Sequence, residues 1–83
     1  MTESSTAMNE LFQLVANVLK VPAHSVSAGT AMEDTPAWDS LAHMDLIVTL
    51  EEHYRMQLTP DDMVALRSVG AIAELLKSKG LLQ

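Results

Sequence analysis

The stretch TPAWDSLAHMDLI, residues 35–47, contains a change from loop to helix that organises the whole sequence. Proline and small residues precede Trp38, whereas apolar residues recur at helical spacing after Ser40. Asp39 and Ser40 are both residue types that cap helices by accepting backbone N–H bonds. The stretch therefore predicts a helix over residues 40–54 with Asp39 or Ser40 as its N-cap.

This predicted helix carries two apolar stripes when residues are placed at 100° steps. The side expected to pack into the protein contains His43, Leu46, Ile47, Leu50 and Tyr54. The second stripe contains Leu41, Met44 and Val48, with Asp45 and Glu52 beside it and Glu51 on its other flank. A helix that contacts neighbours on both sides would also explain two stripes. However, ionised carboxylates are rarely buried without a partner, and residues 39–52 contain no Lys or Arg that could pair with these acids. We expect the second stripe to be exposed and to dock onto basic proteins.

The rest of the chain also reads as helices and one long loop. A first helix, capped by Ser4, Ser5 or Thr6, ends near Lys20; its apolar face is Met8, Leu11, Phe12, Val15 and Leu19. Residues 21–38 form a loop held to the core by Val26 and Met32. Thr59 is the predicted cap of a short third helix, which has Pro60 at its first position and runs through Leu66. Ser68 caps a fourth helix, with Val69, Ile72, Ala73 and Leu76 on one face and Lys77, Lys79 and Gly80 at its end.

These elements predict an all-α fold: a small four-helix bundle with a long loop between helices one and two and a short third helix. Its 83 residues suit one domain, residues 1–83. The chain has no Cys, which excludes disulfides, thiolate metal sites and a cysteine nucleophile. Its net charge of -6 disfavours nucleic acid and anionic membranes as partners. The opening MTESSTAMNE has no basic segment of the kind that begins a signal peptide, so we expect a cytoplasmic protein. We also expect it to be a monomer.

Ser40 has three interpretations. It is a simple cap, or a hydroxyl at a helix N-terminus that favours a phosphate ester, or a nucleophile paired with His43 and Asp39. Catalysis is disfavoured because the wheel turns His43 toward the core and no Gly-x-Ser-x-Gly elbow is present. The three histidines, at positions 24, 43 and 53, lack the i,i+4 spacing of a helical metal site, so no metal is expected.

Asp39-Ser40-Leu41, followed by Leu46, Leu50-Glu51-Glu52 and Tyr54, resembles the acyl carrier protein family over essentially the whole chain. The LTPDD stretch and Ser68-Val69 match the later turns of that family. The resemblance implies a non-catalytic carrier. It further implies that a phosphopantetheinyl transferase moves 4'-phosphopantetheine from coenzyme A to Ser40 and that the thiol of this arm carries cargo as a thioester. It also implies partner contacts with acyl-loading and acyl-transfer enzymes at Asp39, Leu41, Met44, Asp45, Val48 and Glu51.

Two departures from the family pattern lie close to Ser40. The glycine usual two residues before the Asp-Ser-Leu motif is replaced within Pro36-Ala37-Trp38, and Ala42 stands where fatty-acid carriers commonly have an acid. They indicate a stand-alone carrier of a dedicated specialised pathway, with an aminoacyl or peptidyl carrier and an unmodified helical interaction module as alternatives. Trp38 either packs the loop against the helix or contacts the prosthetic arm. Met44 and Met63 are ordinary core residues or yield to a guest chain.

Overall fold

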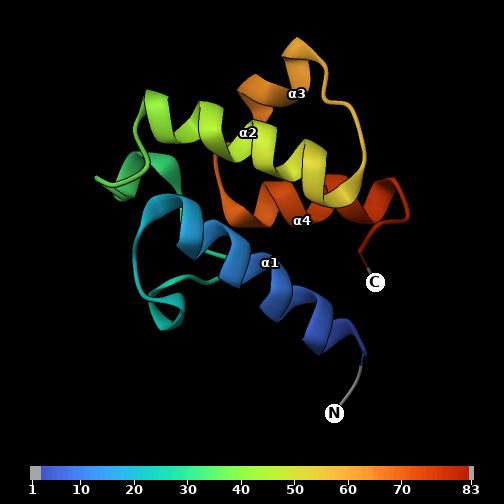
Figure 1. Ribbon diagram of the computed structural model, residues 1–83, viewed down its shortest axis with the longest axis horizontal. Coiled ribbons are helices and arrows are strands. Elements are labelled where there is room, and N and C mark those ends of the chain that lie inside the picture. Colours follow the sequence, from blue (N-terminus) through green and yellow to red (C-terminus); the bar gives the residue numbers. More distant parts are fainter. Residues whose placement is uncertain (1–2, 83) are drawn as a thin grey trace.

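The computed structural model describes residues 3–82, with side chains from residue 7 onward, and is built from four helices (Figure 1). These are α1 (Glu3–Leu19), α2 (Ser40–Tyr54), α3 (Pro60–Ala65) and α4 (Val69–Ser78). Two short 3-10 turns, η1 (Ala23–Ser25) and η2 (Met32–Asp34), interrupt the loop between α1 and α2. No strand occurs within residues 3–82, so the predicted all-α fold with a short third helix is confirmed.

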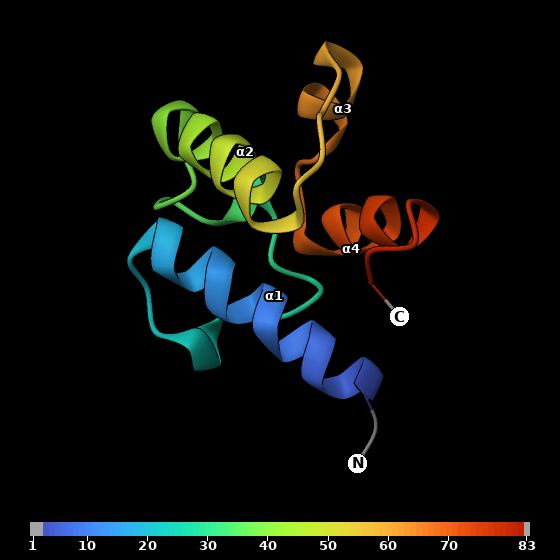
Figure 2. The same cartoon turned by 45° about the vertical axis from the view of Figure 1, so that its right-hand side comes forward.

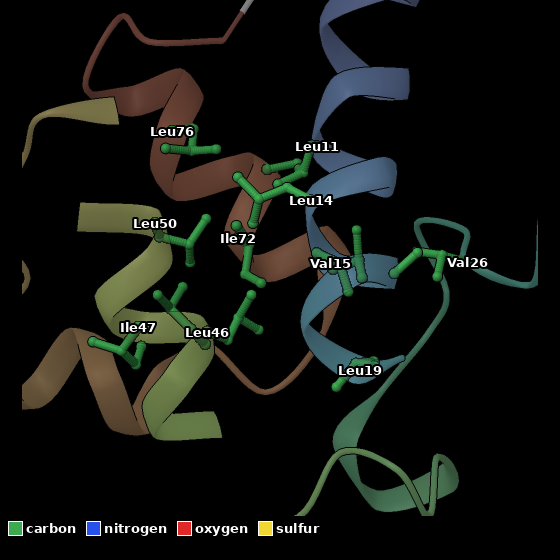
Figure 3. Close-up of a cluster of buried hydrophobic side chains, with 14 of the residues drawn as sticks. Leu11, Leu14, Val15, Leu19, Val26, Leu46, Ile47, Leu50, Ile72 and Leu76 are labelled. Carbon is green, nitrogen blue, oxygen red and sulfur yellow. The ribbon is translucent and has the colours of Figure 1, made fainter. Parts of the chain in front are cut away.

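The core lies where α1, α2 and α4 meet, while α3 lies on the side of α2 away from α1 in both views (Figures 1 and 2). Figure 3 shows side chains of the three longer helices converging in this core: Leu11, Leu14 and Val15 from α1, Leu46, Ile47 and Leu50 from α2, and Ile72 and Leu76 from α4. The predicted inner face of α2 is therefore confirmed for its aliphatic residues. His43 and Tyr54, on the same face, are half-buried.

The predicted start of the first helix is wrong. α1 begins at Glu3, so Ser4, Ser5 and Thr6 lie inside it and none of them is its N-cap. Ser and Thr are only modestly unfavourable within a helix, so these residue types did not have to mark its boundary. The predicted end is close to the observed one, because Leu19 is the last helical residue and Lys20 has a positive φ of 60°.

The long loop is held by backbone pairing to the segment that joins α3 to α4. The N–H of Met32 donates to the carbonyl of Arg67 at 2.8 Å, and the N–H of Gly70 donates to the carbonyl of Ala28 at 2.9 Å. This approach suits glycine, because a Cβ at position 70 would lie 3.1 Å from that carbonyl oxygen. Figure 2 shows the loop, coloured teal to green, passing close to the start of α4.

Side chains of the loop also reach the core. Val26 is buried, as predicted, whereas Met32 is only half-buried. The largest buried side chain of the loop is Trp38, which is 2% exposed. The loop is therefore a fixed part of the fold that leads directly into α2.

The starts of the last two helices follow the predicted caps. The Thr59 hydroxyl and the Asp62 carboxylate form a reciprocal capping box at α3, and the Ser68 hydroxyl accepts the N–H of Ala71 at α4. Bonding to the backbone and hydroxyl of Thr59 lowers the pKa of Asp62. Gly80 has a φ of 74° after the end of α4. In the described part of the chain, no helix combines the length and hydrophobicity that crossing a membrane requires.

Candidate functional site

Asp39, rather than Ser40, is the cap of α2. The Oδ1 atom of Asp39 accepts the N–H of Ala42 at 2.9 Å, and Ser40 is the first helical residue. The structure thus separates two roles that the sequence left open. Asp39 satisfies a backbone donor of the first turn, which leaves the Ser40 hydroxyl without a capping task.

Ser40 differs in this respect from the other serines whose side chains are described. Four hydroxyls form hydrogen bonds with nearby backbone groups, and they belong to Ser25, Ser27, Ser68 and Ser78. Within the described residues, the Ser40 hydroxyl has no such bond, and the residue is exposed. It therefore offers a free hydroxyl at the positive end of the α2 dipole, where negative charge is stabilised.

His43 is fully engaged and does not act on Ser40. The indole Nε1–H of Trp38 donates to Nδ1 of His43 at 3.1 Å, and Nε2 of His43 lies 2.7 Å from the carbonyl oxygen of Met63. An indole nitrogen only donates and a carbonyl only accepts, so these two contacts fit the tautomer in which Nδ1 accepts and Nε2 donates. Neither ring nitrogen is left to take a proton from Ser40. This geometry agrees with the expectation that Ser40 and His43 form no catalytic pair.

Trp38 packs the loop against α2, which was one of its two predicted roles. Its ring stacks on that of His43 with centroids 6.2 Å apart, and the side chain lies in the hydrophobic core. Because it is buried, the indole offers no surface to a prosthetic arm in this conformation. Trp38 acts on the site indirectly, through its contacts with His43 of α2.

The second stripe of α2 is exposed, as predicted. Leu41 is 76% exposed, Met44 54% and Val48 48%, and Asp45 and Glu52 beside them are exposed too. The sequence reasoning missed Val64 of α3, which is 70% exposed. Val64 and Met44 line the same cavity, so the apolar surface extends from α2 onto α3. Short helices such as α3 have too few residues for a periodic signal, which explains the omission.

Glu51 has a structural contact that the sequence did not indicate. Its Oε2 atom accepts the N–H of Leu58 at 2.9 Å, across the turn after α2, and the side chain is half-buried. The turn reverses because Arg55 has a left-handed backbone with a φ of 53°. One oxygen of Glu51 is therefore occupied within the protein, whereas Asp45 points a free carboxylate outward.

A cavity of about 340 Å³ adjoins Ser40. Its walls are mainly apolar and come from α2, η2, α3 and the α3–α4 segment, and they include Met32, Met44, Met63, Val64 and Arg67. A larger cavity, of about 460 Å³, is lined in part by Glu10, Thr49 and His53, and none of the predicted site residues lines it. Proximity to Ser40 makes the smaller cavity the relevant one. Within residues 3–82 no group of three His, Cys, Asp or Glu side chains is arranged to hold a metal ion.

Residues 9–76 match the protein family described as "Phosphopantetheine attachment site". The structure is similar to the holo acyl carrier protein from Geobacter metallireducens, with a TM-score of 0.76 and 33% identity over 88% of this chain and 84% of that one. It shares its fold with the holo acyl carrier protein from Nitrosomonas europaea, with a TM-score of 0.72 and 21% identity over 87% of this chain and 93% of that one. No curated protein matches the sequence significantly.

The family match spans most of the chain and includes the loop, the free serine and the exposed stripe of α2. The relative with 33% identity has the same fold over most of both chains. The chain therefore belongs to the acyl carrier protein family, whose members are non-catalytic carriers with a 4'-phosphopantetheine prosthetic group.

Proposed function

We propose that Ser40 is the residue that carries 4'-phosphopantetheine and that the chain is a stand-alone acyl carrier of a dedicated specialised pathway. The observation that carries this proposal is the free, exposed hydroxyl of Ser40 beside a capping Asp39. Modification forms a bond from Ser40 Oγ to a phosphorus of coenzyme A. It breaks the pyrophosphate bond, releases adenosine 3',5'-bisphosphate and passes the hydroxyl proton to the transferase or solvent. Once bound, the group supplies a terminal thiol that holds an acyl cargo as a thioester.

The residues around Ser40 fit such a group. A phosphodiester on Ser40 would lie at the N-terminus of α2, where the helix dipole favours negative charge. The adjoining cavity of about 340 Å³ is a mainly apolar space into which an arm or its cargo can fold. Two of its walls are Met44 and Met63, flexible side chains that adapt to irregular guests.

The partner surface of this proposal is the exposed stripe of Leu41, Met44 and Val48 together with Asp39, Asp45 and Glu51, extended by Val64. Carrier proteins of this family interact with phosphopantetheinyl transferases and with acyl-handling enzymes in general. We place these contacts on the stripe because it combines exposed apolar area with carboxylates that attract basic docking patches. Glu51 contributes its negative charge to this surface, although one of its carboxylate oxygens already accepts the N–H of Leu58.

Two features near Ser40 support a specialised pathway rather than a general fatty-acid role. Pro36-Ala37-Trp38 replaces a segment that usually contains glycine, and Trp38 uses its bulk and its N–H to fix the loop. Ala42 follows Leu41 and leaves the start of the partner surface without an additional acid. An aminoacyl or peptidyl carrier is the alternative within the same class, and the cargo distinguishes the two.

Intact-mass measurement tests the proposal. Incubation with coenzyme A and a broad-specificity phosphopantetheinyl transferase is expected to add one phosphopantetheine to the protein and none to Ser40→Ala. Ser25→Ala, a matched variant of an exposed serine, is expected to gain the same mass as the unaltered protein. No gain, or a gain that survives Ser40→Ala, would favour an unmodified helical interaction module or another attachment site. Loading of the holo form by acyl- and aminoacyl-activating enzymes then identifies the cargo class.

A further inference from the structure

Arg67 lines the same cavity as Ser40. The chain contains five Lys and Arg residues. Arg55 caps the opposite end of α2, about 22 Å from Ser40 for a helix of this length. The other three follow α1 or lie at the end of α4: Lys20, Lys77 and Lys79. Among the described residues that line this cavity, Arg67 is therefore the one Lys or Arg; the imidazole of His43, which also lines it, is already bonded to Trp38 and Met63.

The backbone of Arg67 is held by hydrogen bonds, whereas its side chain is exposed. Its carbonyl accepts the N–H of Met32 at 2.8 Å, and its own N–H donates to the carbonyl of Ala65 at 2.9 Å. These bonds anchor the residue where the long loop meets the α3–α4 segment. The side chain is exposed, and its guanidinium takes part in none of the side-chain hydrogen bonds formed within the described residues. A fixed Cα with an uncommitted guanidinium suits a residue that receives an anion.

A phosphodiester on Ser40 needs such a partner. It would carry a negative charge directly beside Asp39, in a protein whose net charge is already -6. The α2 dipole offsets part of this repulsion, but its effect is equivalent to only about half an elementary charge. A guanidinium presents its N–H donors in a planar fork that matches phosphate oxygens, which a lysine ammonium does not.

We propose that Arg67 binds the phosphodiester that joins the prosthetic arm to Ser40, and so holds the first atoms of the arm against the apolar wall formed by Met44 and Val64. This inference rests on the proposed attachment at Ser40. It assigns Arg67 a positioning role: the arm begins its path along the cavity between α2 and α3 instead of extending freely into solvent. The cation and the apolar wall act on different parts of the arm, its phosphate and its hydrocarbon.

The test compares the apo and holo forms of three proteins: the unaltered chain, Arg67→Gln and Lys77→Gln. Lys77→Gln removes the same charge from an exposed position on α4 that does not line the cavity. The quantity compared is the Tm of the holo form minus the Tm of the apo form. At low salt, this value is expected to be lower in Arg67→Gln than in the unaltered chain by about 1–6 °C, the range of one surface ion pair in a domain of this size. Lys77→Gln is expected to keep the unaltered difference. The effect should fade at about 1 M salt, where the Debye length falls to roughly 3 Å.

Nuclear magnetic resonance gives a second measurement that does not depend on stability. The phosphorus resonance of the holo protein is expected to shift in Arg67→Gln and not in Lys77→Gln, and the Nε–H resonance of Arg67 is expected to move when the arm is attached. Intact mass confirms first that each variant is fully modified. Equal holo-minus-apo differences and unchanged resonances in modified Arg67→Gln would overturn the role of Arg67 and leave attachment at Ser40 intact. Absence of modification in the unaltered chain would overturn both.

Discussion

The indole N–H of Trp38 donates to Nδ1 of His43 at 3.1 Å, across the junction between the long loop and α2. The other imidazole nitrogen bonds the carbonyl of Met63, near the end of α3. One histidine thus links three segments, and Ser40 lies between the two members of the Trp–His pair in sequence. This linkage gives Trp38 a structural task that explains its presence directly before the Asp-Ser-Leu motif. It also removes His43 from any acid–base role.

A double-mutant cycle on this pair measures the linkage. Trp38→Phe is expected to lower the free energy of unfolding by about 1–3 kcal/mol, because it reduces buried volume and leaves Nδ1 of His43 without a donor. His43→Phe removes the bond from the other side. We expect a coupling energy of about 0.5–1.5 kcal/mol from urea unfolding of the single and double variants. Strictly additive effects would mean that the 3.1 Å contact contributes nothing to stability.

The sequence predicted the helices well because their signals are local. The caps at Thr59 and Ser68 and the apolar spacing of α2 each depend on residues a few positions apart, and the structure contains them where expected. The partners of His43 were not predictable in this way. A helical wheel gives the direction of a side chain, but the carbonyl that His43 meets belongs to a residue 20 positions later.

The candidate site shows the same division between local and distant information. Ser40 and the exposed stripe follow from the motif and from helical periodicity. The bond from Leu58 to Glu51 depends on the left-handed backbone of Arg55, and the approach of Arg67 to the cavity depends on loop pairing. Both result from how distant segments meet, which no pattern within a single helix encodes.

The same substitution, Leu to Ala, at Leu41 and at Leu46 compares the exposed face of α2 with its buried face. Leu46 is fully buried, so Leu46→Ala is expected to cost about 2–5 kcal/mol of stability. Leu41 is 76% exposed, and Leu41→Ala is expected to change stability by less than about 0.5 kcal/mol. The same variant should lower kcat/KM for phosphopantetheinyl transfer by about 3- to 10-fold, as expected for an exposed apolar anchor in an interface. Unaltered transfer by Leu41→Ala would remove this leucine from the partner surface.

Asp45 tests the electrostatic part of docking. Asp45→Lys reverses an exposed charge beside the stripe, and it is expected to slow modification by about 3- to 10-fold at low salt and less at high salt. Glu74→Lys makes the same charge change on the exposed side of α4 and serves as the control. Steady-state kinetics over a range of salt concentrations compares the two. Equal slowing in both variants would indicate an effect of net charge and not of a docking surface.

Glu51 is expected to behave differently from Asp45 because of its contact with Leu58. Glu51→Ala removes the acceptor of the Leu58 N–H and is expected to lower the free energy of unfolding by about 1–2 kcal/mol. Asp45→Ala, its matched control on the same helix, should change stability by less than about 0.5 kcal/mol. Urea unfolding followed by circular dichroism measures both. Similar stabilities of the two variants would show that the 2.9 Å bond is not important for the turn after α2.

Tyr54 provides a test that depends on pH. Its hydroxyl is buried without a hydrogen-bond partner among the described residues, and burial, followed by the charge of Glu10, raises its pKa above the usual value of 10.0. The unfolded chain therefore loses this proton more readily, so the folded state loses stability as pH rises from about 10 through the raised pKa. Tyr54→Phe is expected to be as stable as the unaltered protein at pH 7, or more stable by up to about 2 kcal/mol. Above pH 10 the variant should keep more of its stability than the unaltered protein. Because the two proteins differ at position 54 alone, the difference between their unfolding curves isolates the effect of Tyr54. A constant difference across this range would mean that the phenol titrates equally in the folded and unfolded states.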